Sequence, residues 1–386
     1  MLKRGVLLIG FLSTFSLSLA QHHEAAAETK PATETKVLSA EEAEKEQIKK
    51  ENKEFIDHHL LDAHSFDIMV EKKADGTEHH IGFPLPVIFY DEANGLHAFM
   101  SSEFHHGKEL KDAHGKKYNV VESKGANYAL YHEKIVKTDA SGAITLDDHG
   151  HVTNAKVLDL SITKSVLMIL CASLLMIVIF GSMARNYKKS PIPTGAGKLF
   201  EPLVIFIRDE IAIPNIGPKY HKYISYLLTI FFFILFLNVF GLLPFGINVT
   251  GNLAITAALA IFTFIITQFT ANRNYWQHIF WMPGLPFLMK LVMIPIELIG
   301  MIIKPFALLI RLFANMSAGH IVIMSLIAMI YYFQNVIAGV AFPFLTFVLY
   351  LLEILVAFLQ AYIFTMLSAV YFGMANEEHH HEEAHH

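Results

Sequence analysis

The sequence is poor in cysteine and, over its C-terminal two-fifths, in charge. Its single cysteine, Cys171, lies in an apolar run, so no disulfide within the chain can stabilise a fold. The net charge of −5 gives no sign of nucleic-acid binding. Hydrophobic residues make up 53% of the 386 positions, which indicates a membrane protein. From residue 223 to 376 only six residues are Lys, Arg, Asp or Glu: Arg273, Lys290, Glu297, Lys304, Arg311 and Glu353.

The N-terminus has the pattern of a secretory signal peptide over residues 1–20. Lys3 and Arg4 precede a short apolar stretch, and Ser18 and Ala20 provide small residues at a cleavage site. An uncleaved membrane anchor is the alternative. Either one predicts that the polar segment that follows is exported.

The exported segment divides into a charged linker, 21–56, and a small β-rich domain, 57–160. The linker is low in complexity and has no core of its own. The domain alternates short apolar runs with turn residues such as "DEANG". Fourteen of the 22 histidines lie between His22 and His151, many in pairs. Without a ligand spacing they indicate solvated surface residues, or a proton-buffering surface, and we predict no metal and no cofactor.

The remaining chain predicts an α-helical polytopic membrane domain, 161–378, with a short His-rich tail at 379–386. We expect about five membrane helices and an amphipathic interfacial helix at 199–213. Basic residues follow the first and third apolar stretches, which places those ends and the C-terminus in the cytoplasm. The apolar stretches are 165–183, 223–246, 252–270, 287–332 and 343–373.

The last two stretches predict a long hairpin with an uncharged outer turn at 332–343. As one helix, 287–332 would extend ~69 Å at 1.5 Å per residue, about twice a perpendicular crossing. It must therefore be steeply tilted, broken near Pro295 or Pro305, or both.

Polar residues repeat along one side of the first hairpin helix. Glu297, Lys304 and Arg311 are spaced by seven, and Asn315 lies one turn beyond Arg311, so they form one stripe. An ionised group at mid-membrane costs ~2.5–3.5 kcal/mol on insertion scales and usually faces water or a partner. Lys304 has a simpler explanation, because its long side chain can reach the membrane surface.

The second hairpin helix offers Glu353 and Gln360, also seven apart. An antiparallel hairpin can pair His320 with Glu353 and Arg311 with Gln360, and both pairs place the centre of the turn near residue 336. A buried structural ion pair would explain His320 and Glu353, but such a pair can also relay protons. Titratable groups on both sides of Arg311 indicate two half-paths.

Arg311 cannot itself relay protons, because a guanidinium stays charged at any physiological pH. It can hold an opposing carboxylate ionised. The chain offers no carboxylate at the level of Arg311, so the sequence predicts that its partner is an acid of another subunit.

The stretches "KPFALLIRLFANMSAGH" and "LLEILVAFLQAYIFTMLSAVYFGMANEEH" closely resemble subunit a of the F-type ATP synthase membrane sector. The pattern R-L-F-x-N-M-x-A-G followed by L-Q-A-Y-I-F carries the resemblance, which extends more loosely over 162–378. It implies a proton-translocating stator subunit of a bacterial inner membrane, without a catalytic site of its own. Its partners would be the c-ring, b-type peripheral stalk subunits and the rest of the synthase.

The resemblance also implies roles for individual residues. Arg311 would face the ionisable carboxylate of the rotating c-ring, with Gln360 and Asn315 as companions. Glu297 would belong to the inner half-channel, and His320 and Glu353 to the outer one. Many bacterial members have this acid and histidine exchanged. Gly241 stands where some relatives have an acid.

Two other classes compete with this prediction. A standalone transporter or channel would need its own central binding site and usually an internal repeat, neither of which is found. A membrane sensor would need a sizeable cytoplasmic output domain, whereas only a twelve-residue tail follows the last helix. The sequence does not distinguish protons from sodium ions.

Overall fold

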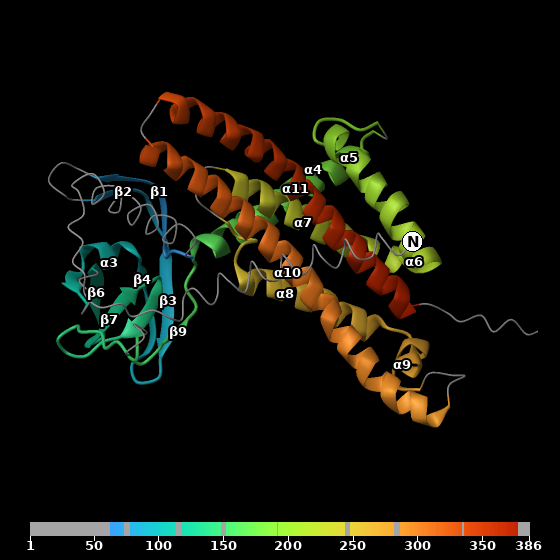
Figure 1. Cartoon of the computed structure of the whole chain (residues 1–386), viewed down its shortest axis with the longest axis horizontal. Helices are drawn as coiled ribbons and strands as arrows, with labels where there is room; N and C mark the ends of the chain where they lie inside the picture. The colour runs from blue at the N-terminus through green and yellow to red at the C-terminus, as the bar shows by residue number, and fades with distance from the viewer. Residues whose placement is uncertain are drawn as a thin grey trace, which may run out of the picture. The chain divides into compact units, whose positions relative to one another are not determined.

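The structure, a computed structural model, describes residues 62–72, 78–112, 117–147, 152–190, 192–243, 248–281, 286–333 and 336–376. Strands occupy the part before residue 160, and helices the part after it (Figure 1). The predicted signal peptide, linker and C-terminal tail lie outside the described residues.

Short antiparallel strands form three sheets, as the alternation of apolar runs and turns predicts. β1 (Ser65–Lys72) pairs with β2 (Glu78–Pro84). A second sheet has the order β4–β3–β9, with β3 (Pro86–Asp91), β4 (Gly95–Met100) and β9 (Leu158–Asp159). A third has the order β5–β6–β7–β8, with β5 (Lys108–Lys111), β6 (Lys117–Ser123), β7 (Ala126–Tyr131) and β8 (Lys134–Lys137). The short helix α3 (Ser102–His106) connects the second sheet to the third.

The turn between β6 and β7 shows why these strands pair in register. Lys124 and Gly125 both have positive φ, 50° and 79°, as a two-residue hairpin turn requires. The β7–β8 turn uses His132 and Glu133, with φ of 49° and 57°, although neither is glycine. The second turn is therefore strained, and strain of this kind persists only where other contacts hold it.

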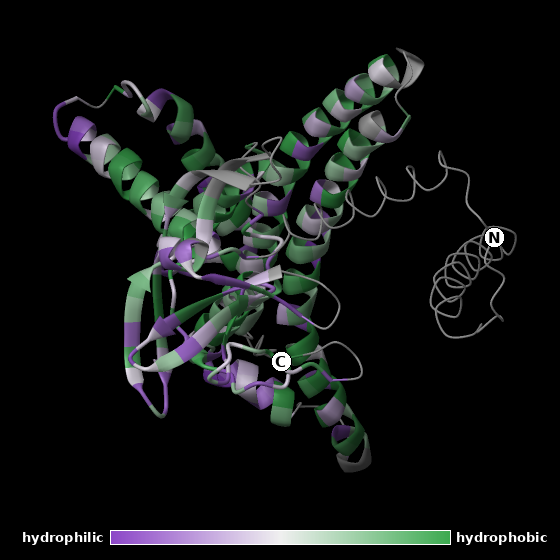
Figure 2. Cartoon of the chain, turned by 90° about the vertical axis from the view of Figure 1, so that its left-hand side faces the viewer, coloured by the Kyte–Doolittle hydropathy of each residue, from purple (hydrophilic) through white to green (hydrophobic). Residues whose placement is uncertain are grey.

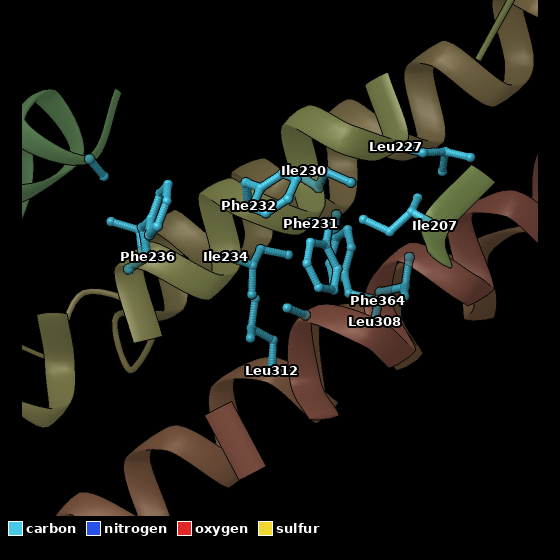
Figure 3. Close-up of a cluster of buried hydrophobic side chains, with 14 of the residues drawn as sticks. Ile207, Leu227, Ile230, Phe231, Phe232, Ile234, Phe236, Leu308, Leu312 and Phe364 are labelled. Atoms are coloured by element: carbon cyan, nitrogen blue, oxygen red, sulfur yellow. The ribbon is translucent and has the colours of Figure 1, made fainter. Parts of the chain in front are cut away.

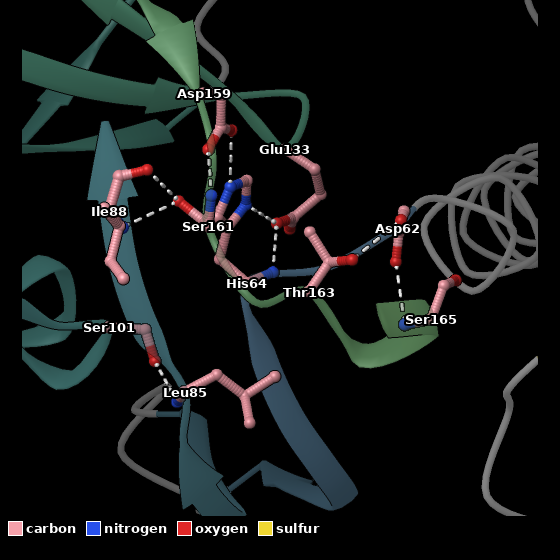
Figure 4. A network of polar contacts seen from close by, with 10 residues as sticks. All are labelled: Asp62, His64, Leu85, Ile88, Ser101, Glu133, Asp159, Ser161, Thr163 and Ser165. Carbon is pink, nitrogen blue, oxygen red and sulfur yellow. Dashed lines mark hydrogen bonds and ion pairs between the residues drawn. The ribbon is translucent and has the colours of Figure 1, made fainter. Parts of the chain in front are cut away.

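The beginning of the first membrane helix, α4 (Lys164–Tyr187), is tied to the β-rich part by polar contacts (Figure 4). Asp62 accepts hydrogen bonds from the Thr163 hydroxyl at 2.9 Å and from the Ser165 backbone N–H at 3.1 Å. Thr163 is also the N-cap of the helix. The Asp62 carboxylate thus lies at the positive end of the helix dipole, a stabilising position.

Five helices in the described residues are long and apolar enough to cross a membrane, as predicted. Polar positions are isolated along these helices, which are otherwise hydrophobic (Figure 2). They are α4, α7 (Ile224–Leu242), α8 (Leu253–Thr270), α10 (Phe287–Phe333) and α11 (Val336–Asn376).

Shorter helices connect the long ones. The predicted amphipathic segment forms α5 (Gly197–Phe206), a π-helical stretch η1 (Ile207–Ala212) and α6 (Ile213–Ile216), followed by the 3-10 helix η2 (Gly217–Lys222). Ile207 and Ile211 are buried, whereas Arg208 and Asp209 form an exposed ion pair, so the segment is amphipathic as expected. α9 (Arg273–Phe280) connects α8 to α10.

The helices enclose one continuous apolar core around α7 (Figure 3). Phe231, Phe232 and Ile234 of α7 are fully buried, and Leu308 and Leu312 of α10 pack into the same cluster. Leu308 and Leu312 are four residues apart and therefore lie on one face of α10. This packing fixes which face of α10 points away from the core.

The structure distinguishes between the alternatives for the first hairpin helix and corrects the extent of the turn. α10 runs for 47 residues without interruption through Pro295 and Pro305, so of those alternatives the break is not found. The predicted turn at 332–343 is mostly helix, because α11 begins at Val336 and contains Pro343. Membrane helices tolerate proline where neighbouring groups satisfy the freed carbonyl, and the apolar, uncharged "VIAGVAF" is compatible with a helix.

Candidate functional site

Arg311 lies on the face of α10 that points away from the core. Leu308 and Leu312 on either side are 2% and 1% exposed, while Arg311 and Asn315 are exposed. Among the described residues, no carboxylate lies within ion-pair distance of the Arg311 guanidinium. Ile310 and Phe306 beside it are also exposed, at 49% and 58%. The chain thus presents a permanent positive charge within an apolar surface.

Gln360 differs from Arg311 in its surroundings. It is 2% exposed on α11, next to the fully buried Ala361. No hydrogen bond joins Gln360 to Arg311 in the part of the chain that the structure describes, so the predicted direct pair stays a prediction.

The α10–α11 hairpin brings His320 and Glu353, the predicted outer pair, to neighbouring positions. The carboxylate of Glu353 on α11 lies against the backbone of Gly319, the residue before His320 on α10. A Cβ on Gly319 would overlap Oε1 of Glu353. Between the described residues no ion pair joins His320 to Glu353, and Nε2 of His320 is buried without a hydrogen-bond partner. The hairpin register therefore agrees with the prediction to within one residue, and the direct pair stays a prediction.

The positive charge of Lys164, at the start of α4, acts electrostatically on His320. The predicted place of His320 in an outer half-channel stays a prediction.

A polar network that the sequence did not predict lies between α7, the 248–252 loop and the hairpin. Fully buried Asn238 donates to the carbonyl of Ala357 at 3.1 Å and accepts from the Thr250 hydroxyl at 2.9 Å. Asn248 donates to the carbonyl of Met316 at 3.3 Å. These bonds tie the loop to both hairpin helices, beside Gly319. Asn248 therefore has a structural role.

Glu297 and Lys304 line a cavity of about 180 Å³ on the other side of Arg311. Tyr275 and His278 of α9 line it as well. The charge of Glu297 acts on Lys304, whose ammonium lies 5.7 Å from the centre of the Tyr371 ring. Lys304 therefore faces this cavity.

A second, much smaller cavity of about 10 Å³ adjoins the first, because Tyr275 and Lys304 line both. Gln268 lines it with a buried carbonyl oxygen that has no partner in the described residues, and its amide donates to the Tyr275 hydroxyl at 3.4 Å. Tyr371 also lines the smaller cavity, and the positive charge of Arg311 acts electrostatically on its hydroxyl. Polar groups thus extend from Glu297 toward Arg311.

The contributions of α8 and α9 to these two cavities were not predicted from the sequence. Gln268 is a single polar residue near the end of the apolar helix α8, and Tyr275 and His278 lie on α9, a short connection that carries no periodic signal. The only available indication was a cluster of polar and aromatic residues between two apolar stretches.

Among the described residues, no group of three or more His, Cys, Asp or Glu side chains could hold a metal ion. Most side chains of the paired histidines at 58–59, 79–80 and 105–106 lie outside the described residues.

This arrangement defines a class of polytopic membrane protein with titratable groups on two sides of an arginine that has no carboxylate partner among the described residues. The family model described as "ATP synthase A chain" matches residues 166–373, more than half of the sequence. The chain therefore belongs to the ATP synthase A chain (subunit a) family. A domain of unknown function, DUF8433, matches residues 55–160.

Curated relatives agree with this assignment. ATP synthase subunit a of Chlorobium phaeobacteroides strain BS1 is 40% identical over 325 residues, which are 79% of this chain and 93% of that protein. ATP synthase subunit a of Chloroherpeton thalassium is 49% identical over 59% of this chain and 70% of that protein. For ATP synthase subunit a 2 of Chlorobaculum tepidum the identity is 48%, over 56% of this chain and 64% of the relative.

Proposed function

We propose that the chain translocates protons through two offset half-channels to and from the c-ring of an F-type ATP synthase, coupling the proton gradient to ATP synthesis. One observation carries the proposal: Arg311 is exposed on an apolar face, with no carboxylate of the described residues beside it. A charge in such a place needs a partner, and an acid on a passing c-subunit would supply one.

The outer half-channel would end at His320 and Glu353. A proton from outside would pass these groups and neutralise a ring carboxylate, which then turns through lipid. Among the described side chains, Nε2 of His320 is buried without a partner and is therefore available to a proton or a water molecule.

The inner half-channel would be the cavity lined by Glu297, Lys304 and His278. A ring carboxylate would release its proton toward this cavity and then be held ionised by Arg311. Each charge that crosses ~100 mV contributes ~2.3 kcal/mol, so several must pass for each ATP. The chain would transport, and the catalytic steps would lie in other subunits.

The proposal includes the surroundings of the chain. Its partners would be the c-ring, b-type stalk subunits and the lipid bilayer of a bacterial inner membrane. The β-rich domain would lie in the periplasm and the C-terminus in the cytoplasm. Sodium in place of protons is the second possibility, and transport measured with and without a sodium gradient distinguishes the two.

Arg311→Ala tests the proposal. In the assembled synthase we expect the variant to lose ATP synthesis and ATP-driven pumping, because nothing then holds the ring acid ionised. Arg273→Ala, which removes an arginine of α9 outside the hairpin, is the matched control and should retain both. Near-normal pumping by an assembled Arg311→Ala complex would refute the role.

A further inference from the structure

One sheet of the β-rich part is apolar on both faces. On its inner face Val87 and Phe89 are fully buried. On its outer face the strand register aligns apolar side chains across three strands: Tyr90 lies opposite Leu96 of β4 and Leu158 of β9, and Ile88 lies opposite Ala98. We call this surface the outer sheet face, formed by Ile88, Tyr90, Leu96, Ala98, Met100, Leu158 and Leu160.

The outer sheet face is uncovered by the described residues. Leu158, Leu160 and Leu96 are 61%, 58% and 54% exposed, and Tyr90 and Met100 are 45% and 42% exposed. An antiparallel sheet with one buried face normally carries polar residues on the other. A contiguous apolar patch on a folded domain marks a contact with a membrane or another molecule.

This face continues into a membrane helix. After β9 the chain still follows β3, because the N–H of Leu160 donates to the carbonyl of Ile88 at 2.9 Å and that of Ile162 to Pro86 at 3.1 Å. α4 then begins at Lys164, and the Lys164 N–H donates to the carbonyl of Ala63 at 3.0 Å.

The distance along the chain brings the face close to the bilayer. Leu160 precedes Lys164 by four residues, which span at most roughly 13 Å when extended. The polar boundary of a bilayer extends ~5–8 Å beyond its hydrocarbon core on each side. α4 itself exposes Leu170 and Leu174, at 52% and 62%, as a lipid-facing helix would. The outer sheet face therefore lies within a few residues of a helix that exposes apolar side chains to lipid.

We propose that the outer sheet face rests on the boundary between lipid headgroups and acyl chains, in the leaflet where α4 begins. Leucine and methionine side chains would enter the acyl boundary, and Tyr90 would place its ring there and its hydroxyl among the headgroups, as interfacial tyrosines do. Asp62 and Thr163 would hold the domain in this position, since they join it to the first turn of α4. This contact is independent of proton transport.

Spin labelling in the full-length chain tests the contact. With Cys171→Ser as background, Ala98→Cys places a nitroxide on the outer sheet face, and Ala140→Cys places one on an exposed loop that follows β8. Both changes replace an exposed alanine, so the two variants are matched. The synthase would be reconstituted into vesicles of phosphatidylcholine and phosphatidylglycerol, and accessibility to oxygen and to a water-soluble nickel chelate would be measured.

We expect the label at position 98 to be several-fold more accessible to oxygen than to the nickel chelate, and the label at position 140 to show the reverse. Equal access of the chelate to both labels would overturn the proposal. A label at position 98 that is immobile and protected from both reagents would also overturn it, because residues 21–61, a second copy or another subunit would then cover the face. ATP synthesis by both labelled complexes establishes that they are intact.

Discussion

Glu353 and Gly319 are in direct contact across the α10–α11 hairpin, and this contact sets the place of the carboxylate beside His320. A Cβ on Gly319 would overlap Oε1 of Glu353, so only glycine admits the carboxylate at this position. The hydrogen bond from the Asn248 amide to the Met316 carbonyl holds α10 close to the same level. The position of the Glu353 carboxylate in the proposed outer half-channel therefore depends on the absence of a side chain at Gly319.

Gly319→Ala should displace Glu353 and slow proton flow. Moving the side chain off its rotamer costs on the order of 0.5–1.5 kcal/mol, so we expect passive proton conduction to fall several-fold while the complex still assembles. Conduction would be measured in vesicles that contain the membrane sector alone.

Gly300→Ala is the matched control, because a Cβ at Gly300 of the same helix meets nothing within 4 Å. It should leave conduction unchanged, and alanine is the better helix former of the two. Equal conduction by the two variants would show that the Glu353 position does not matter to proton flow.

His278→Phe should obstruct the inner cavity. The change puts an apolar ring in place of a polar residue that lines the same cavity of about 180 Å³ as Glu297. We expect a several-fold decrease in ATP-driven proton pumping, similar to that of Glu297→Gln. Because both residues would serve one path, the double variant should be little worse than either single variant.

Trp276→Phe on the same short helix is the control for this experiment. Trp276 stacks on Phe280 at 6.1 Å and does not line the cavity, so pumping should persist. Fully additive losses in the double variant would place His278 and Glu297 on separate routes.

The sequence predicted those features that repeat along a single helix. The seven-residue spacing of Glu297, Lys304 and Arg311 indicated one stripe. The hairpin register, which came from pairing His320 with Glu353 and Arg311 with Gln360, agrees with the Gly319–Glu353 contact to within one residue. The extent of the outer turn could not be predicted, because an apolar, uncharged segment near the membrane surface is compatible with either helix or loop.

Contacts between segments that are distant along the chain could not be predicted from the sequence. Tyr275 and His278 line the inner cavity, and Gln268 lines the smaller cavity beside it, through the placement of α8 and α9 against α10, which no local pattern encodes. Asn238 lies in an apolar run, where one asparagine gives no indication of its partners. Its two hydrogen bonds join residues separated by 119 and 12 positions.

Asn238→Leu should destabilise the membrane domain. The change removes both hydrogen bonds and leaves the buried Thr250 hydroxyl without its acceptor, a cost of about 1–3 kcal/mol, whereas the Ala357 carbonyl keeps its place in the helical hydrogen bonding of α11. We expect a lower temperature of thermal unfolding for the purified full-length protein in detergent. Thr229→Val, at an exposed position of the same helix, should have little effect. An unchanged unfolding temperature in Asn238→Leu would mean that the network contributes no net stability.

His64 should make the stability of the β-rich domain fall at alkaline pH. Its ring, 1% exposed, contacts Asp159 at 2.9 Å and Glu133 at 3.5 Å (Figure 4). Burial alone lowers the pKa of His64, but the hydrogen bonds and charges of Asp159 and Glu133 outweigh it and raise the pKa to about 9. The strained β7–β8 turn that presents Glu133 is held by the same contact.

The direction of the pH dependence follows from this raised pKa. Since the pKa of His64 is about 9 in the folded domain and 6.5 as its ordinary value, the stabilisation is complete below pH 6.5 and is lost as the pH rises through 9. A difference of this size corresponds to a free energy of unfolding on the order of 3 kcal/mol. The unfolding temperature of the full-length protein should therefore fall between pH 6.5 and pH 9.5, and the fall should be much smaller in His64→Gln. His106→Gln, at an exposed histidine of the same domain, should retain the full pH response. If the His64→Gln protein kept that response as well, the charge of His64 would not be its origin.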